Sequence, residues 1–298
     1  MNSINQYHDQ LYQNIFNIKS RIKFSFEFFP PINYSDPQGK FLSSIKKLSI
    51  FNPNFISITC TSKNNIEDYT YQSIQKIPKK LNLNIAPHMI CANFSKKYIR
   101  DLAKRYWDDG IKSIVALRGD SLHNKNSLKF YASDLVYLLK QVADFDISVA
   151  AYPEKHPESK NIKDDINNLK MKINCGANRA ITQFFFDVDK YLKFRDNCLK
   201  VGISVDIIPG ILPIVNFQQL KKFVSMTNVH IPKWIHNIFQ NVSHEDIYIN
   251  KMVGLLICVN IIQKLCSEGV SSFHFYTLNH FDTIYTLCTL LQQNSSFE

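Results

Sequence analysis

The chain has 298 residues, of which 45% are hydrophobic and 13% aromatic, so it can bury a large core as one barrel or as two smaller domains. Its formal net charge is +10, which first suggests a nucleic-acid partner. Only six of the 35 basic residues are arginine, however, and the lysines are scattered along the chain without a basic run. Because phosphate and base readers favour arginine, we expect no nucleic-acid partner, whereas an acidic small-molecule substrate remains compatible.

The cysteines and the apolar runs predict the cellular compartment of the protein. The seven cysteines are widely spaced and contain no C-x-x-C motif, which argues against zinc or disulfide frameworks and favours a reducing, cytoplasmic location. Residues 1–20 mix polar residues with apolar ones at helical spacing, unlike a signal peptide, and predict a helical extension that covers one end of the domain. The longest apolar run, 252–262, falls short of the ~20 residues of a membrane span, so we expect a soluble protein without membrane association.

Strands and helices are expected to alternate along the whole chain. Short apolar, β-branched or aromatic runs predict strands at 24–29, 55–59, 85–91, 113–117, 147–151, 180–185, 205–208 and 273–276. Helical spacing follows each of them. The predicted helices lie near 41–48, in a polar stretch that ends at 77, and over 95–108, 132–143, 163–174, 188–201, 217–226, 247–266 and 281–291. Ser95 is the predicted N-cap of the helix that ends at 108.

Glycines give independent support for this alternation. Gly110, Gly176, Gly202 and Gly269 each follow a predicted helix and precede a strand by three or four residues, as left-handed C-caps do. Eight βα units without a linker predict one domain over 1–298, a (β/α)₈ TIM barrel with an extra N-terminal helix and extra helices around strands 7 and 8. A doubly wound open sheet is the alternative, but the chain has no G-x-G-x-x-G or G-x-x-x-x-G-K motif.

Polar residues gather where the predicted strands end, which is where parallel barrels place their ligand sites. The strand at 113–117 delivers Arg118, Gly119 and Asp120, either a solvated turn with a local ion pair or part of a ligand site. The other strand ends carry Glu27, Thr59, His88, Tyr152 with His156, Gln183 and Tyr276. Any one of these could be structural, and His88 beside Pro87 reads more readily as a core histidine, but their convergence favours a site.

Glu27 is the most informative of these residues. Alternation along the strand places Ser25 and Glu27 on one face and Phe24, Phe26 and Phe28 on the other. With the phenylalanines packed on helices, Glu27 faces the barrel interior, where apolar surroundings would raise its pKa and suit it to general-acid work. A buried glutamate paired with a lysine or arginine is the equally open alternative.

No activated nucleophile and no metal-binding spacing can be drawn from the sequence. His274 and His280, six residues apart across a strand end, make a poor ligand pair. An enzyme of this kind would therefore depend on a bound organic cofactor.

Seven motifs in order along the chain resemble the methylenetetrahydrofolate reductase family of the bacterial type. They are FEFFPP at 26–31, PH at 87–88, ALRGD at 116–120, AAYPEKHP at 150–157, ITQFFFD at 181–187, IPGILP at 208–213 and FHFYTLN at 273–279. The resemblance runs from about residue 22 to 291, nearly the whole chain. The chain ends at Glu298, so no regulatory domain like that of the larger eukaryotic members is expected.

The resemblance implies a barrel that holds FAD at its mouth and uses NADH or NADPH and methylenetetrahydrofolate in turn. The folate would open to an iminium ion after protonation and accept a hydride, giving methyltetrahydrofolate for methionine synthesis, in a homo-oligomeric enzyme. By position, Glu27 matches the family's proton donor, and Asp120 matches a residue that contacts both folate and flavin. Flavin contacts are implied for Thr59, His88, Arg118, Gly119, Asp120, Tyr131, Ala132, Tyr152, His156, Asp165, Asn168 and Lys172. Substrate contacts are implied for Asp120, Gln183, Gln219 and Phe223, and for position 280.

Two positions depart from the family pattern. Cys60 and Thr61 follow Thr59 where an aromatic residue and a glycine are expected, which puts the local flavin packing in question. His280 follows Asn279 where an arginine is expected, so we expect weaker binding of the acidic folate.

Two other functions remain open from the sequence. One is another flavin-dependent barrel, similar to proline dehydrogenase, in which the motif around Glu27 would have no evident role. The other is a basic barrel protein that binds a polyanion and contains no flavin.

Overall fold

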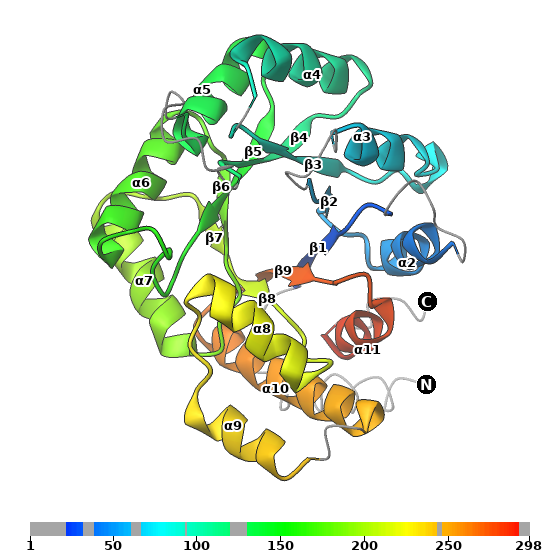
Figure 1. Cartoon of the computed structure of the whole chain (residues 1–298), viewed down its shortest axis with the longest axis vertical. Helices are drawn as coiled ribbons and strands as arrows, with labels where there is room; N and C mark the ends of the chain where they lie inside the picture. The colour runs from blue at the N-terminus through cyan, green and yellow to red at the C-terminus, as the bar shows by residue number, and fades with distance from the viewer. Residues whose placement is uncertain are drawn as a thin grey trace, which may run out of the picture.

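The structure is a computed structural model that describes residues 22–31, 39–60, 67–92, 94–119, 130–242 and 246–291. Viewed down its short axis, a ring of strands is surrounded by helices (Figure 1). All strand pairs are parallel. The strands are β1 (Lys23–Phe28), β2 (Phe55–Ile58), β3 (Ile85–Ile90), β4 (Ser113–Leu117), β5 (Asp146–Ala151), β6 (Arg179–Thr182), β7 (Asp206–Ile208), β8 (Gly210–Ile211) and β9 (Ser272–Tyr276).

Helices follow the strands in the order that the sequence predicts. They are α2 (Lys40–Leu48), α3 (Glu67–Gln75), α4 (Lys96–Asp108), α5 (Ala132–Val142), α6 (Ile162–Asn174), α7 (Val188–Lys200), α8 (Phe217–Thr227), α9 (Lys233–Gln240), α10 (Ile247–Ser267) and α11 (Phe281–Leu291), with short 3₁₀ turns at Ser49–Phe51 and Lys79–Leu81. The TIM-barrel prediction is therefore confirmed, as are the extra helices between β8 and β9. The predicted N-terminal helix over 1–20 lies outside the described residues.

The barrel closes through a divided seventh strand. β7 pairs with β6, β8 pairs with β9, and β9 pairs with β1. Pro209 separates β7 from β8 because proline has no N–H to donate to a ladder. Its carbonyl still accepts the N–H of His274 at 3.0 Å, so the two short pieces act as one strand of an eight-stranded barrel.

The sequence analysis misplaced one strand end and missed one helix. The sixth strand ends at Thr182 rather than at residue 185. The side chain of Gln183 accepts a hydrogen bond from the N–H of Phe184, so that N–H does not continue the ladder. The ring of Phe185 packs against Tyr191 of α7, with 5.0 Å between the ring centroids. Helix α9 was not predicted. It begins after Pro232 and buries Ile235 and Phe239 on one face.

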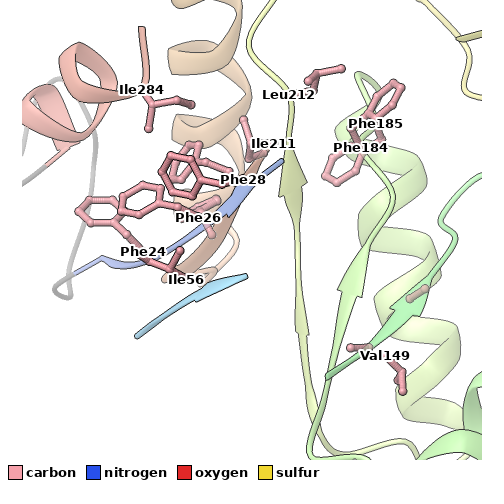
Figure 2. Packing of buried hydrophobic residues seen from close by; sticks show 14 of the residues in the cluster. Phe24, Phe26, Phe28, Ile56, Val149, Phe184, Phe185, Ile211, Leu212 and Ile284 are labelled. Carbon is pink, nitrogen blue, oxygen red and sulfur yellow. The ribbon is translucent and has the colours of Figure 1, made fainter. Parts of the chain in front are cut away.

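The core has an outer and an inner part. Phe24, Phe26 and Phe28 project from one side of β1 toward the helix that carries Ile284 (Figure 2), and Phe28 meets Phe41 of α2 edge to face at 6.3 Å. A separate cluster fills the barrel interior and consists of Phe55, Ala86, Val115 and Ile181, with Leu117 beside it. The predicted alternation on β1 is confirmed, and it leaves Ser25 and Glu27 facing inward.

Helix α10 ends one residue beyond the helix predicted at 247–266. Among the described residues it is the one helix whose length and composition would allow it to cross a membrane. Core helices pass the same test, and α10 contributes Ile257, Ile261 and Leu265 to the hydrophobic core. Its Gly254 lies so close to the carbonyl of Ile214 that an added Cβ would stand 1.8 Å from that oxygen, so α10 is packed directly against the end of the barrel.

Candidate active site at the carboxyl end of the barrel

Glu27 lies between two histidines inside the barrel. Its Oε2 is 3.4 Å from Nε2 of His88 on β3 and 3.8 Å from Nε2 of His274 on β9. The side chain of Glu27 is 16% exposed, whereas those of His88 and His274 are 8% and 1% exposed. The parallel register pairs Ser25 with His274 and Glu27 with Tyr276, so all four side chains face the same interior.

Beside these two histidines Glu27 is a carboxylate, whereas the sequence analysis expected a raised pKa that favours the protonated acid. Burial by itself raises the pKa of Glu27, but hydrogen-bonding and charge interactions with His274 and His88 outweigh burial and lower the pKa to about 2. The expectation of a raised pKa was therefore wrong, and so was lysine or arginine as the partner. The carboxyl of Glu27 is ionised because the two imidazoles stabilise the carboxylate.

A strand end beside Glu27 presents a buried polar atom without a partner among the described residues. Thr59 Oγ1 is inaccessible to solvent and has no hydrogen-bond partner there, whereas the equally buried Nε2 of His88 faces the Glu27 carboxylate at 3.4 Å. Buried polar atoms are nearly always paired, so such an atom at the mouth of a barrel suits a site that a polar ligand completes. His88 is thus a partner of Glu27 rather than the core histidine that the sequence first suggested.

Arg118 leaves the end of β4 and reaches the loop after β5. Its Nη1 forms an ion pair with Glu158, and its side chain is 32% exposed. Gly119 has a φ of +80°, and an added Cβ would stand 2.9 Å from Cβ of Ile90, so the turn accepts only glycine without rearrangement. Asp120 lies outside the described residues, and its predicted role stays a prediction.

The loop after β5 is well ordered by hydrogen bonds. The rings of Tyr152 and His156 meet edge to face at 4.6 Å. Asp165 on α6 accepts the backbone N–H of His156 at 2.9 Å and the hydroxyl of Ser159. Burial lowers the pKa of His156, so this ring is mainly neutral at pH 7 and contributes less to neutralising a phosphate than the sequence analysis assumed.

The remaining predicted cofactor residues lie along α6 and at the start of α5. Burial lowers the pKa of Lys172 to about 8, and its Nζ donates to the carbonyl of Ala150 on β5. Asn168 is exposed on the same helix, α6. Tyr131 and Ala132 begin α5, where the N–H of Tyr131 donates to Asp134 at 2.9 Å.

The predicted substrate residues come from three further segments. Gln183 follows β6, and Gln219 and Phe223 lie one turn apart on α8, both partly buried. His280 follows β9 and is exposed, with a pKa lowered by burial and by the nearby charge of Lys251. The barrel topology places these segments at the same end as Glu27, although the described contacts do not join them to it.

The sequence matches a known protein family over nearly its whole length. The family model for methylenetetrahydrofolate reductase matches residues 11–292. The chain belongs to the methylenetetrahydrofolate reductase family. It is 52% identical over 289 residues to the 5,10-methylenetetrahydrofolate reductase of Buchnera aphidicola subsp. Schizaphis graminum, with 97% of this chain and 98% of that protein covered. It is 48% identical over 283 residues to the 5,10-methylenetetrahydrofolate reductase of Escherichia coli strain K12, with 95% of each covered.

Comparison with solved structures supports the fold. An uncharacterized protein from Clostridium thermocellum, which binds two copies of 5-methyl-5,6,7,8-tetrahydrofolic acid, superposes with a TM-score of 0.63 at 19% identity, covering 95% of this chain and 98% of that one. Membership of the methylenetetrahydrofolate reductase family, with the barrel that accompanies it, confirms the resemblance drawn from the seven motifs. It also supports reduction of methylenetetrahydrofolate as the reaction, and it argues against the polyanion-binding and proline-dehydrogenase-like alternatives.

Sequence reasoning missed three residues of the candidate site. His274 was considered only as a metal ligand, although its position, alternating with the outward Phe273 and Phe275, already indicated an inward side chain. Ser25 was placed inward but given no role, and its Oγ lies 2.8 Å from Nδ1 of His274. Glu154, 8% exposed, pairs with Lys190 of α7 and so fixes the loop after β5.

Proposed function

We propose that the protein reduces 5,10-methylenetetrahydrofolate to 5-methyltetrahydrofolate with NADH or NADPH as hydride donor and FAD as cofactor. We place it in the cytoplasm, as a homo-oligomer that supplies methyl groups for methionine synthesis. The observation that carries the proposal is Glu27, held between His88 and His274 at a barrel mouth where the buried Thr59 Oγ1 has no partner among the described residues.

The residues present fit a flavin dinucleotide. Thr59 Oγ1 is a buried atom, without a partner among the described residues, that a polar ring edge would satisfy. Arg118 and Lys172 offer positive charge for a pyrophosphate, and Arg118 already holds the carboxylate of Glu158, which an incoming phosphate would replace. FAD, when bound, supplies the hydride-carrying chemistry that links the two substrates in a ping-pong sequence.

The protein's own residues have separate tasks in this reaction. Because a bound folate would exclude water from Glu27, and loss of solvation raises the pKa of a carboxyl group, Glu27 takes up a proton in that complex and delivers it to open the methylene bridge of the folate. Gln183, Gln219 and Phe223 hold the folate and the nicotinamide in turn, and Asp120 contacts the folate. The loop after β5 positions Tyr152 and His156 against the cofactor. Hydrogen bonds and burial, rather than a Gly-rich loop, therefore fix the ligands.

The purified protein tests this proposal directly. We expect a yellow protein whose flavin absorption is bleached by NADH or NADPH under anaerobic conditions and restored by methylenetetrahydrofolate in stopped-flow mixing. Glu27→Gln should keep the bleaching step and lose the folate step, and Arg118→Ala should be purified with little flavin. A colourless wild-type protein, or flavin that methylenetetrahydrofolate does not reoxidise, would contradict the proposal.

A further inference from the structure

Three basic side chains gather over one sector of the carboxyl end of the barrel. His280 follows β9, Lys40 begins α2 after β1, and Lys251 lies near the start of α10, in the segment between β8 and β9. β1, β9 and β8 are neighbours in the sheet, so the segments that follow them leave the barrel close together. Helix α11, which begins just after His280, stands between α2 and α10 (Figure 1).

The position of His280 is fixed by the loop after β9. Thr277 donates its hydroxyl to the carbonyl of Glu27 at 2.6 Å and accepts the N–H of Asn279 at 3.1 Å. The N–H of His280 donates to the carbonyl of Thr277 at 2.8 Å. His280 therefore ends a short hydrogen-bonded turn that is attached to the strand carrying Glu27.

The packing of α10 directs Lys251 to the same end of the barrel. Gly254 lies so close to the carbonyl of Ile214, in the loop after β8, that no Cβ fits between them. Lys251 precedes Gly254 by three residues and so lies on the same face of α10, and helical side chains tilt toward the N-terminus. The side chain of Lys251 is half-buried, and no ion pair joins it to another residue in the described parts of the chain.

The charges of Lys251 and Lys40 act on the ring of His280. Burial lowers the pKa of His280 most, the positive charge of Lys251 comes next, and Lys40 acts in the same direction. Because charges are screened over about 10 Å at ordinary ionic strength, both ammonium groups lie within about that distance of the ring. Asp282, in the first turn of α11, opposes them with one negative charge. Two lysines against one aspartate leave this rim cationic, although the histidine itself is mainly neutral at pH 7.

A folate has its negative charge at the end that is remote from its reacting carbon. The methylene bridge, where Glu27 would act, joins the pterin to the aminobenzoyl group, and the glutamate with its two carboxylates is attached to the far side of that group. With the bridge at Glu27 and with Gln219 and Phe223 of α8 as proposed contacts, the glutamate would reach the rim beside α8, α10 and the start of α11. An ammonium group partly removed from water binds a carboxylate there more strongly than a fully exposed one does.

We propose that Lys251 binds a carboxylate of the folate's glutamate, that Lys40 at the outer rim adds a weaker attraction, and that the chain recognises the glutamate in this way although position 280 is a histidine. The inference rests on the proposed function. Lys251 contacts the substrate far from the reacting atoms, so it sets affinity and specificity and takes no part in the proton or hydride steps.

Equilibrium binding to the oxidised holoenzyme tests this inference without turnover. The two probes are 5-methyltetrahydrofolate and the N-methylamide of 5-methyltetrahydropteroate, which keeps the pterin and benzoyl groups but has no carboxylate. In Lys251→Gln we expect the dissociation constant of the folate to rise about tenfold and that of the amide to change less than about twofold. Lys251→Arg should keep the wild-type preference for the folate. Lys40→Gln should raise the folate dissociation constant only about twofold, because Lys40 is exposed.

Lys264→Gln is the matched control, because Lys264 is an exposed lysine near the other end of α10 and should not affect either probe. If Lys251→Gln weakens both probes equally, or keeps the wild-type preference for the folate, Lys251 does not bind the glutamate and the proposal is overturned. Ionic strength gives a check that needs no variant: salt should weaken binding of the folate to the wild type more than binding of the amide, and an equal response would also overturn the proposal. A wild type that binds neither probe would refute the proposed function, and this inference with it.

Discussion

The side chain of Asn279 pairs with both backbone polar groups of Phe29. Its Oδ1 accepts the N–H of Phe29 at 2.9 Å, and its Nδ2 donates to the carbonyl at 3.0 Å. Next to this pair, Thr277 donates its hydroxyl to the carbonyl of Glu27 at 2.6 Å. The loop after β9 therefore fixes the end of β1 just beyond Glu27, and it does so from a left-handed Asn279 with a φ of +57°.

Removing the amide of Asn279 should destabilise this corner. We expect Asn279→Ala to lower the free energy of unfolding by about 2 kcal/mol, because it loses two hydrogen bonds and also disfavours the left-handed backbone. Urea unfolding measures the change. Asn279→Gly is the matched control, because glycine keeps the left-handed backbone and loses only the two hydrogen bonds. An equal loss of unfolding free energy in both variants would assign the effect to the amide. No loss in either variant would contradict the argument.

The low pKa of Glu27 makes stability depend on pH. The folded-state pKa of about 2 lies below the ordinary value of 4.5, so the carboxylate stabilises the fold fully above pH 4.5, and this contribution is lost as the pH falls toward 2. We expect the free energy of unfolding of the wild type to fall more steeply than that of Glu27→Gln between pH 4.5 and 2. Parallel curves from urea titrations at several pH values would argue against a stabilised carboxylate.

Glu154 should affect the affinity for the cofactor, although in the proposed complex its side chain does not contact the cofactor itself. It anchors the loop after β5, which carries Tyr152 and His156. Its carboxylate receives the Lys190 amine and the backbone N–H of His230, at 3.3 and 3.4 Å from the two oxygens. Glu154→Gln weakens this anchor and should raise the flavin dissociation constant roughly tenfold. Fluorescence titration of the apoprotein with FAD measures it. Asp189→Asn, on the exposed side of α7, is the control and should bind FAD as the wild type does. If Glu154→Gln lowers the melting temperature but leaves the FAD affinity unchanged, Glu154 has a purely structural role.

His280 should weaken binding of the acidic folate. Burial and the charge of Lys251 lower its pKa, so the ring is mainly neutral at pH 7 and offers no full charge to a carboxylate. His280→Arg should lower the folate dissociation constant about tenfold, because an arginine forms charge-assisted, bidentate bonds. His280→Gln should bind folate as the wild type does. Equal affinity of all three proteins in equilibrium titrations would remove position 280 from the folate site.

Local patterns in the sequence determined the order of the elements and the direction of their side chains. The predicted bounds of β4 and α11 agree with the structure, and so do the N-cap at Ser95 and the inward direction of Glu27. These features depend on residues close together in the chain, where the periods of strands and helices are visible. The seven motifs likewise indicated the family that the comparisons show.

Only the tertiary structure decided the chemistry at Glu27. Its charge state depends on His88 and His274, which β3 and β9 bring to one oxygen from distant parts of the chain. The same is true of the closure at Pro209, where two short strands pair with different neighbours. Sequence periodicity places a side chain inside the barrel, but the pKa of a carboxyl group is set by the groups within a few ångströms of it, and those are chosen by the fold.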